Sequence, residues 1–419
     1  MLLLLDERAR IRGIGTAAGL CGDWFGSRAV LAPEVQLRPV TEPFTVPDMQ
    51  PRVEPAGGVV GGGWFGYLSY DLTDPSGRAG ALPAAVWGWA DHVLRLDTDG
   101  WWWFESLDAE VEPAEFERLL HLPAPAPAWR AGPLEHSAPG EHERVVEACV
   151  REIESGELYQ ANVCTRFEGA FDGSPAALFA QGVRDLQPRR AALLTGDWGG
   201  VVSFSPELFL ARHGGRVRST PIKGTLPRRG AADDALERQL RESAKDVAEN
   251  VMITDLVRND LGRVCTTGSV RVPEILAVRP APGVWHLEST VEGRLTCSDA
   301  ELLAAAFPPG SVTGAPKIRA LDLIAELERR PRGVYTGAIG LASPVAGLEL
   351  NVAIRTFELH GDRIALGVGG GITADSDPAA EWQECLHKAA PLEELLRQGT
   401  AEPVVAGVDQ ARRAASTAS

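Results

Sequence analysis

The spacing of apolar residues predicts four helices in the second two thirds of the chain. In the first of them, Val146, Cys149 and Ile153 recur at helical spacing, and Gly156 is a suitable stop. Proline suits the first turn of a helix, so a helix is expected after each of two prolines near the C-terminal end. The four predicted helices cover residues 141–155, about 233–257, the stretch after Pro316 and the stretch after Pro378.

Short runs rich in β-branched and aromatic residues predict strands around these helices. Strands and helices come in uneven blocks rather than in strict alternation. This arrangement favours an α+β fold over a doubly wound parallel sheet. The predicted strands lie around residues 61–70, 101–104, 201–204, 334–342, 349–358 and 363–368.

A proline-rich stretch at 122–140 is typical of a linker and is expected to divide the chain. Before it lies an N-terminal region, residues 1–121, rich in Gly and Trp. After it comes a larger domain at 141–397. Residues 398–419 lack apolar periodicity and are expected to form a flexible tail. The prolines of the linker are Pro123, Pro125, Pro127, Pro133 and Pro139.

Charge narrows the class of protein. The 419 residues carry 41 Lys+Arg against 57 Asp+Glu, a formal net charge of −16. A surface of this sign repels nucleic acid and anionic lipid, so neither is expected as a partner. The initial Leu run is too short for a secretory signal, and no stretch reaches the ~20 apolar residues of a membrane span, so the expected location is cytoplasmic. The six cysteines are scattered without metal-binding spacing and are expected to be reduced.

Two of the predicted helices each carry an acidic pair three residues apart, which places both carboxylates on one helix face. The pairs are Asp246 with Glu249 and Glu381 with Glu384. If the helices face one another, four carboxylates converge, and Mg²⁺ is the natural cation for such oxygen ligands. Acidic pairs are also common on solvated faces. Lys388, one turn beyond Glu384, could form a surface ion pair or point to an anionic ligand, and the pattern alone leaves both readings open.

Two glycine-rich runs and one lysine are further candidates. Residues 309–317 open a helix but lack the Gly-Lys-Ser/Thr of a nucleotide phosphate loop. Residues 367–371 could bring backbone amides close to a ligand, although tight turns explain both runs as well. Lys223 lies between Pro221 and Gly224. A lysine is a nucleophile only where burial or a nearby cation lowers its pKa, and spacing alone leaves Lys223 an ordinary loop lysine.

Nine segments, ordered along the larger domain, carry a far more specific pattern. They are Ser205-Pro206-Glu207, PIKGT at 221–225, AKDVAENVMITDLVRNDLGR at 244–263, HLESTVEG at 286–293, PPGSVTGAPK at 308–317, RGVYTGAIG at 332–340, Ile354-Arg355-Thr356, GGGITADSDP at 369–378 and EWQECLHKA at 381–389. Together they resemble the chorismate-binding enzyme family, which includes anthranilate, aminodeoxychorismate, isochorismate and salicylate synthases. The resemblance implies large mixed or antiparallel sheets packed face to face with helices outside. It makes 141–397 the chorismate-binding catalytic domain, and it is weak over the first 120 residues.

The resemblance assigns roles residue by residue. Glu207 matches the general acid that protonates the departing 4-hydroxyl of chorismate, so burial should raise its pKa towards neutrality. Lys223 matches a residue that bonds covalently to the substrate. The positions that match the substrate pocket are Gln160, Gly224, Thr225, His286, Ser311, Tyr335, Arg355, Gly369, Gly370, Gly371 and Lys388.

Two positions favour one branch of the family. Members that add water carry a Lys base where this chain has Gln160, and Gln cannot deprotonate water, which disfavours isochorismate or salicylate synthesis. Anthranilate synthases typically have Ala where this chain has Lys223, whereas aminodeoxychorismate synthases resemble this chain. The implied reaction is attack of Lys223 on carbon 2 of chorismate, loss of the 4-hydroxyl, and addition of ammonia at carbon 4. The alternatives are formation of anthranilate or 2-amino-2-deoxyisochorismate, and a non-catalytic chorismate-binding role.

The resemblance also implies a metal and a partner. Glu249 and Glu384 match direct Mg²⁺ ligands, with Asp246 and Glu381 close by. Four carboxylates should raise the pKa of Lys223, so attack by its amine is expected to depend on the metal. No cysteine lies in a Gly-x-Cys-x-Gly turn, so a separate glutamine amidotransferase subunit is expected to supply ammonia. No clear Leu-Leu-Glu/Asp-Ser element of a tryptophan site is found, so feedback by tryptophan is not expected.

Overall fold

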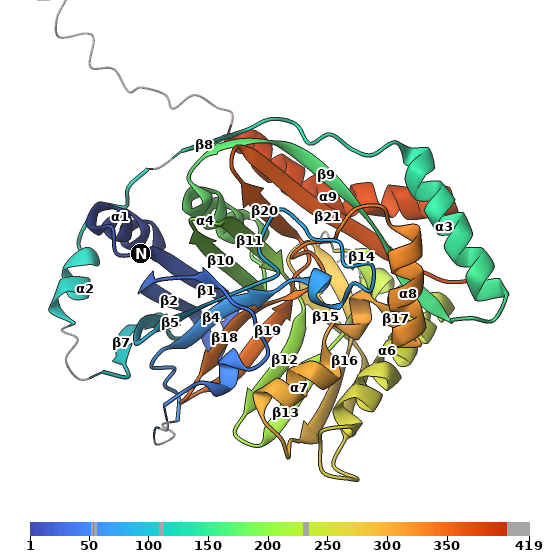
Figure 1. The fold of residues 1–419 in the computed structure, drawn as a ribbon, viewed down its shortest axis with the longest axis horizontal. Coiled ribbons are helices and arrows are strands. Elements are labelled where there is room, and N and C mark those ends of the chain that lie inside the picture. The colour runs from blue at the N-terminus through green and yellow to red at the C-terminus, as the bar shows by residue number, and fades with distance from the viewer. Residues whose placement is uncertain (52, 54–56, 109–112, 127, 229–233, 400–419) are drawn as a thin grey trace, which may run out of the picture.

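The computed structural model describes the chain except for residues 52, 54–56, 109–112, 127, 229–233 and 400–419. The described part is built on two large sheets, sheet A and sheet B, with helices on the outside (Figure 1). Strands pair in antiparallel fashion in both sheets. One apolar core lies between them, because Leu20 and Leu194 of sheet A belong to the same buried cluster as Phe65 and Leu341 of sheet B. The predicted α+β class is confirmed.

Sheet A runs through the whole molecule. Its strands are β1 (Thr16–Trp24), β2 (Ser27–Val35), β6 (His92–Leu96), β7 (Trp102–Ser106), β8 (Trp129–Ala131), β9 (Gln160–Gly173), β10 (Arg190–Gly196), β11 (Gly199–Ser205), β17 (Gly314–Ala315), β20 (Thr356–His360) and β21 (Arg363–Ile372). Their order is β17-β9-β21-β20-β11-β10-β1-β2-β6-β7, and β8 also pairs with β9.

Sheet B packs against sheet A. Its strands are β3 (Arg38–Pro39), β4 (Gly63–Leu68), β5 (Ala85–Ala90), β12 (Leu208–His213), β13 (Arg216–Thr220), β14 (Ile222–Pro227), β15 (Arg271–Ala281), β16 (Val284–Arg294), β18 (Ala338–Ser343) and β19 (Gly347–Val352). Their order is β14-β16-β13-β12-β19-β18-β4-β5-β3, and β15 also pairs with β16.

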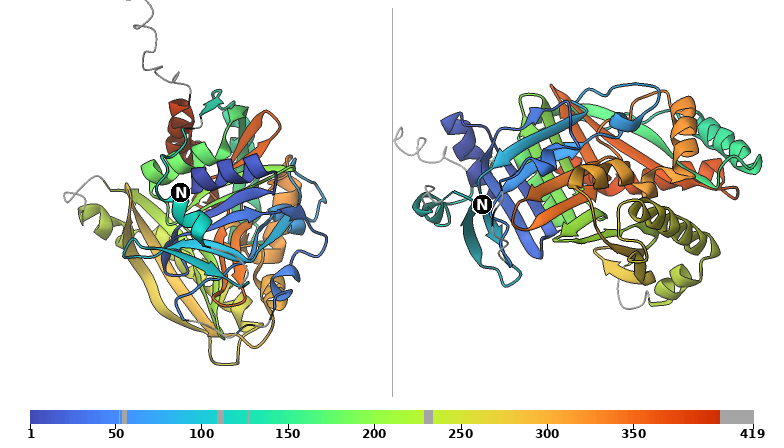
Figure 2. Two further views of the ribbon diagram at one scale, coloured as in Figure 1. Left: turned by 90° about the vertical axis from the view of Figure 1, so that its left-hand side faces the viewer. Right: turned by 60° about the horizontal axis from the view of Figure 1, so that its bottom comes forward.

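Helices cover the sheets unevenly. The α-helices are α1 (Leu2–Arg12), α2 (Ala114–Leu119), α3 (Pro139–Glu154), α4 (Pro175–Leu186), α5 (Asp234–Glu242), α6 (Ala244–Gly262), α7 (Asp299–Ala306), α8 (Lys317–Leu327) and α9 (Pro378–Gln398), and short 3-10 turns include η2 (Tyr70–Thr73) and η4 (Gly310–Val312). Helices α3, α8 and α9 gather at the end of the molecule opposite the N-terminus, with α6 beside them (Figure 2). In the described part of the chain, no helix combines the length and apolar character that a membrane span needs.

Apart from β8, the strands from before residue 140 form one end of each sheet and the strands from after it form the other end, and the two blocks meet at one strand pair. Strand β1 lies between β2 and β10, and β4 lies between β5 and β18. The division of the chain at 122–140 stays a prediction. Part of that stretch forms β8, which pairs with β9. Pro127 and the expected tail from residue 400 onwards lie outside the described residues.

Two element boundaries differ from the prediction, each for a local reason. The single helix expected over 233–257 is two helices, α5 and α6, because the Ser243 side chain accepts a hydrogen bond from the Asp246 N–H and starts a new helix. The strand expected over 349–358 is two strands, β19 and β20. The chain turns between them at Arg355, whose φ of 51° is incompatible with a strand.

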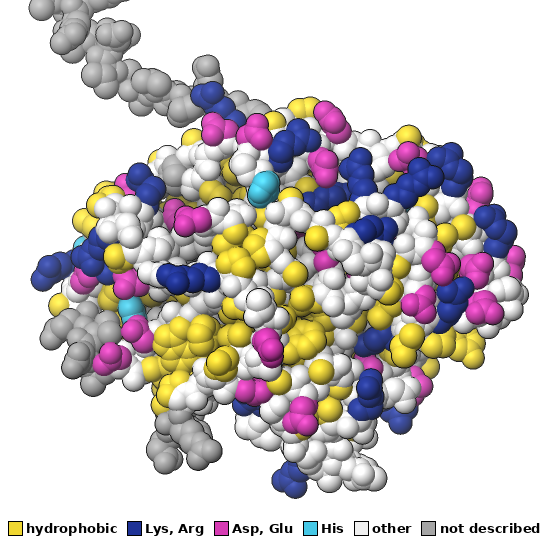
Figure 3. Space-filling model, in the orientation of Figure 1, with side chains coloured by type: hydrophobic (Ala, Val, Ile, Leu, Met, Phe, Trp, Pro, Cys, Tyr) yellow, Lys and Arg dark blue, Asp and Glu magenta, His cyan; other side chains and the backbone are white. Residues whose placement is uncertain are grey.

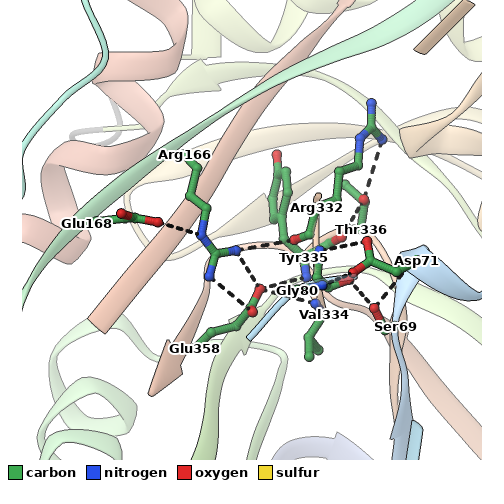
Figure 4. A network of polar contacts seen from close by, with 11 residues as sticks. Ser69, Asp71, Gly80, Arg166, Glu168, Arg332, Val334, Tyr335, Thr336 and Glu358 are labelled. Carbon is green, nitrogen blue, oxygen red and sulfur yellow. Dashed lines mark hydrogen bonds and ion pairs between the residues drawn. The ribbon is translucent and has the colours of Figure 1, made fainter. Parts of the chain in front are cut away.

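A buried group of charged residues joins distant segments behind the end of β18 (Figure 4). Arg166 of β9 donates one hydrogen bond to each carboxylate oxygen of Glu358 on β20, both at 3.2 Å. Asp71 of η2 accepts from the Gly333 N–H at 2.9 Å. We call Asp71, Arg166, Glu328, Arg332 and Glu358 the arginine network. It ties the N-terminal strands to the segment that enters β18.

On the face of the molecule in Figure 3, hydrophobic and uncharged surface occupies much of the middle, and acidic and basic side chains are interspersed around it. No large region of one sign stands out on this face.

Candidate active site

Lys223 is held in the interior by an irregular strand. Strand β14 pairs Ile222 with Glu288 and Thr225 with His286, so its register shifts at the lysine. Gly224 allows this shift, with a φ of 90°, which disfavours other residues. The Lys223 side chain is 9% exposed, and its Nζ lies 3.9 Å from Oε2 of Glu249 on α6.

The electrostatic balance at Lys223 differs from the expectation. Burial is the largest influence and lowers the pKa of the Lys223 amine. Glu249 raises this pKa, and the Lys388 ammonium group lowers it again, so that the pKa lies below its ordinary value. Glu249 and Glu384 do raise the pKa of Lys223, as expected, but loss of hydration outweighs their attraction, so the net shift is downward.

Glu207 lies between β11 and β12 and is 3% exposed. Burial raises its pKa to about 7, although a hydrogen bond with Ser311 and the Lys223 ammonium group oppose this rise. A carboxylic acid with this pKa is half protonated at neutrality and can donate a proton. The raised pKa of Glu207 favours its proton-donating acid form, and the lowered pKa of Lys223 favours its nucleophilic neutral amine.

Four carboxylates come near one another where α9 packs on β21 and α6 packs on β14. A Cβ placed on Gly370 would lie 3.0 Å from Oε2 of Glu381 and 3.8 Å from Oε1 of Glu384, so the glycine allows α9 to approach the strand. Asp246 comes close to the same region, since a Cβ on Gly224 would lie 3.0 Å from its Cβ. We call Asp246, Glu249, Glu381 and Glu384 the acidic cluster.

Ammonium groups pair with three members of this cluster. Lys388 Nζ lies 2.7 Å from Glu384 Oε1 and donates to the Gly369 carbonyl at 2.7 Å. Lys245 Nζ lies 3.2 Å from Glu381 Oε1, and the third pair is that of Lys223 with Glu249. Lys388 forms the ion pair with Glu384 in this structure, and its role towards an anionic ligand stays a prediction.

The donor set suits a hard divalent cation in its chemistry. Carboxylate oxygens are the ligands that Mg²⁺ prefers, and Oε2 of Glu381 is buried without a hydrogen-bond partner. Across the described residues, no three Asp, Glu, His or Cys side chains already stand close enough to hold a metal ion. Three of these carboxylates each pair with a lysine instead.

Two buried polar atoms without hydrogen-bond partners lie close to Lys223 and Thr225 of β14. His286 Nδ1 and Thr225 Oγ1 are 3.0 Å apart, whereas His286 Nε2 is unpartnered. Burial and the Arg355 guanidinium lower the pKa of His286 to about 3, so the ring is neutral. Oε1 of Gln160 is also unpartnered, and both Gln160 and Lys223 approach Gly371 of β21. Such atoms suit a polar ligand.

Tyr335 stands apart from the other predicted pocket residues. Its ring packs on Gly367, and its hydroxyl shares a hydrogen bond with Cys164. It lines a cavity of about 590 Å³ on the α3 side of β9, together with His142 and Arg332. A role for Tyr335 in substrate binding stays a prediction.

The sequence reading missed two residues of the site, Lys245 and Ser376. Both donate to Oε1 of Glu381, at 3.2 Å and 2.7 Å respectively. A basic residue in the first turn of a helix opposes the helix dipole, and Lys245 occupies such a position in α6. That mismatch was the available signal. Ser376 had none, because its place depends on how the chain turns between β21 and α9.

The sandwich of antiparallel sheets and the buried lysine, glutamate and acidic cluster define a class of protein. The model of the family described as chorismate binding enzyme matches residues 29–394. The chain belongs to this family of chorismate-binding enzymes.

Individual relatives are similar to different extents. Aminodeoxychorismate synthase component 1 of Klebsiella aerogenes is 44% identical over 265 residues, which cover 62% of this chain and 58% of that protein. The protein of the same name from Salmonella typhimurium is 37% identical over 345 residues, 78% of this chain and 75% of that protein. The crystal structure of anthranilate synthase component I from Streptococcus pneumoniae TIGR4 matches with a TM-score of 0.74 at 28% identity, over 83% of this chain and 84% of that chain.

Proposed function

We propose that this chain is component I of an aminodeoxychorismate synthase, which converts chorismate and ammonia into 4-amino-4-deoxychorismate. The observation that carries the proposal is a pair of buried groups that interact electrostatically. The pKa of the Lys223 amine is lowered, and the pKa of the Glu207 carboxyl is raised to about 7. The similarity to two proteins named aminodeoxychorismate synthase component 1 supports it. The chain matches only 58% of the length of the first of them.

The proposed chemistry has two steps. The neutral Lys223 amine forms a bond to carbon 2 of chorismate, the ring double bonds shift, and the 4-hydroxyl leaves as water with a proton from Glu207. Ammonia then forms a bond to carbon 4, the double bonds shift back, and Lys223 leaves carbon 2. Gln160 matches the position at which water-adding members of the family carry a Lys base. It supplies a neutral amide instead, which disfavours hydroxylation.

The remaining site residues bind and orient in this proposal. Mg²⁺ held by Glu249 and Glu384, with Asp246 and Glu381 nearby, would supply positive charge for one carboxylate of chorismate. Arg355 and the amides of Gly369 to Gly371 would face the other. A separate glutamine amidotransferase subunit would supply ammonia, and ammonium salts would replace it in vitro.

Product analysis tests the proposal. The purified chain is incubated with chorismate, MgCl₂ and ammonium at pH 8, and the products are separated by chromatography with mass detection. We expect 4-amino-4-deoxychorismate with its enolpyruvyl group intact. Anthranilate, detected by its fluorescence, would instead support the second candidate, which the likeness to the Streptococcus anthranilate synthase favours. Absence of any product would favour a non-catalytic role.

A further inference from the structure

Lysine is rare in this chain and is concentrated at the site. Only four of its 41 basic residues are lysines: Lys223, Lys245, Lys317 and Lys388. Three of them each pair with one carboxylate of the acidic cluster. The fourth, Lys317, is largely buried and donates to Asp260 at 2.6 Å and to two backbone carbonyls. All the other basic residues are arginines, so the lysine at position 245 calls for an explanation.

Lys245 is less firmly held than its two neighbours at the cluster. Lys223 is buried, and Lys388 also donates to the Gly369 carbonyl. The Lys245 side chain is 46% exposed, and its hydrogen bond within the described residues is the one to Glu381. It stands in the first turn of α6, where a positive charge opposes the helix dipole. The acidic cluster therefore holds Lys245 against a local electrostatic cost.

The partner of Lys245 is Glu381, a buried carboxylate with one oxygen that accepts no hydrogen bond. Glu381 is 4% exposed, and its Oε1 accepts from both Lys245 and Ser376. Its Oε2 has no partner. A buried carboxylate is stabilised by a positive charge close by, and Lys245 provides that charge for Glu381. The Lys245 ammonium group can move into solvent by breaking a single hydrogen bond, the one to Glu381.

We infer that Lys245 is a resident counter-ion of the acidic cluster, which a divalent cation must displace, and that it thereby sets the affinity of the cluster for the metal. The inference rests on the proposed function, in which the acidic cluster holds Mg²⁺. With three ammonium groups facing four carboxylates, the cluster is close to neutral before a cation enters. Metal binding then releases Lys245 from Glu381 into solvent.

Calorimetric titration of the substrate-free full chain with MgCl₂ tests the inference directly. Lys245→Gln removes the charge and keeps most of the length of the side chain. We expect this variant to bind Mg²⁺ on the order of tenfold more tightly than the wild type, since the metal no longer competes with an ammonium group. Lys245→Arg keeps the charge and should stay within about twofold of the wild type or bind more weakly.

Arg241→Gln is the matched control. Arg241 lies four residues before Lys245 and pairs with Glu237 at 2.9 Å, away from the acidic cluster. Arg241→Gln changes the net charge by the same amount as Lys245→Gln, so it measures only the long-range electrostatic effect on Mg²⁺ affinity. If Lys245→Gln binds Mg²⁺ no more tightly than Arg241→Gln, the inference is overturned, while Mg²⁺ binding by the wild type leaves the proposed function standing. If the wild type binds no Mg²⁺ and is fully active in EDTA, the metal of the proposed function fails and takes the inference with it.

A second readout uses thermal unfolding by scanning calorimetry. Without metal, Lys245→Gln should melt below the wild type, because Glu381 loses its counter-ion. Saturating Mg²⁺ should raise its melting temperature by more than it raises that of the wild type or of Arg241→Gln. An equal rise in all three proteins would contradict the inference.

Discussion

The arginine network and the acidic cluster are two groups of buried charges in one molecule, and they are built differently. Arg332 of the network is 5% exposed and donates to Glu328, to two backbone carbonyls and to Thr336. Its partners surround it on every side. In the acidic cluster each ammonium group pairs with one carboxylate, at distances from 2.7 to 3.9 Å. Oε2 of Glu381 has no partner there.

The contrast separates charges that fix a structure from charges that are ready to change partners. A guanidinium group is planar, remains charged and offers five donors in fixed directions. Burial opposes the charge of Arg332, but Cys164 and Glu328 beside it outweigh burial and raise its pKa well above the ordinary value. An ammonium group is a compact charge on a flexible stem, and burial readily lowers its pKa, as at Lys223. Arginine therefore suits the arginine network, where the ion pairs stay fixed. Lysine suits the acidic cluster, where the ion pairs can exchange partners.

The largest expected effect comes from removing the nucleophile. Lys223→Ala should lower ammonia-dependent product formation about 10³-fold or more, because the first bond to the substrate can no longer form. Lys223→Arg should be equally inactive, since guanidinium keeps the charge but not the nucleophile. Product formation is measured by chromatography, and the melting temperature shows whether the fold persists. Full activity of Lys223→Ala would refute the covalent role.

Glu207→Gln should lower the rate by a factor of about 10² to 10³, because the leaving hydroxyl loses its proton donor. The pH dependence sharpens this prediction. Burial raises the pKa of Glu207 from 4.5 to about 7, so the acid form exists below that pH and is lost above it. With the wild type, kcat/KM should fall as the pH rises through about 7. A falling limb that persists unchanged in Glu207→Gln would assign it to another group.

Disruption of the arginine network should affect stability rather than chemistry. Arg332→Ala leaves the buried Glu328 without its partner and should lower the free energy of unfolding by about 3–5 kcal/mol. Urea unfolding followed by circular dichroism measures this loss. The double variant Arg332→Ala, Glu328→Ala should recover part of it. Mg²⁺ affinity should change little in either. A loss below 1 kcal/mol would show that the network is not the rigid structure inferred here.

The smallest expected effect concerns the start of α6, which carries half of the acidic cluster. Ser243→Ala removes the side chain that accepts from the Asp246 N–H and should destabilise the protein by about 1 kcal/mol. Ser243→Asn, another good capping residue, should recover most of this. If Ser243→Ala also weakens Mg²⁺ binding, the cap helps to position Asp246. Unchanged stability would show that the break between α5 and α6 has another cause.

The sequence predicted elements and chemistry better than it predicted how charges balance. Helical spacing located α3, a proline suited to the first turn located α9, and i,i+3 spacing placed each acidic pair on one face of its helix. It did not reveal the break at Ser243, because a serine inside an apolar periodicity has no unique reading. The pKa of Lys223 depends on how deeply β14 is buried, and no local pattern reports depth. The roles of Lys223, Glu207 and the pocket residues rest on the resemblance, since spacing alone left them open.

The joining of an N-terminal block of strands to a C-terminal block in each sheet has a consequence for synthesis on the ribosome. Strand β1 needs β10, some 170 residues later, and β4 needs β18, some 270 residues later. Neither sheet can close until most of the polypeptide has emerged, so folding is expected to be late and slow rather than progressive from the N-terminus. A fragment cut in the proline-rich stretch would expose the edges of β10 and β18 and should aggregate. The linker is thus a poor place to divide this chain, although its composition suggests the opposite.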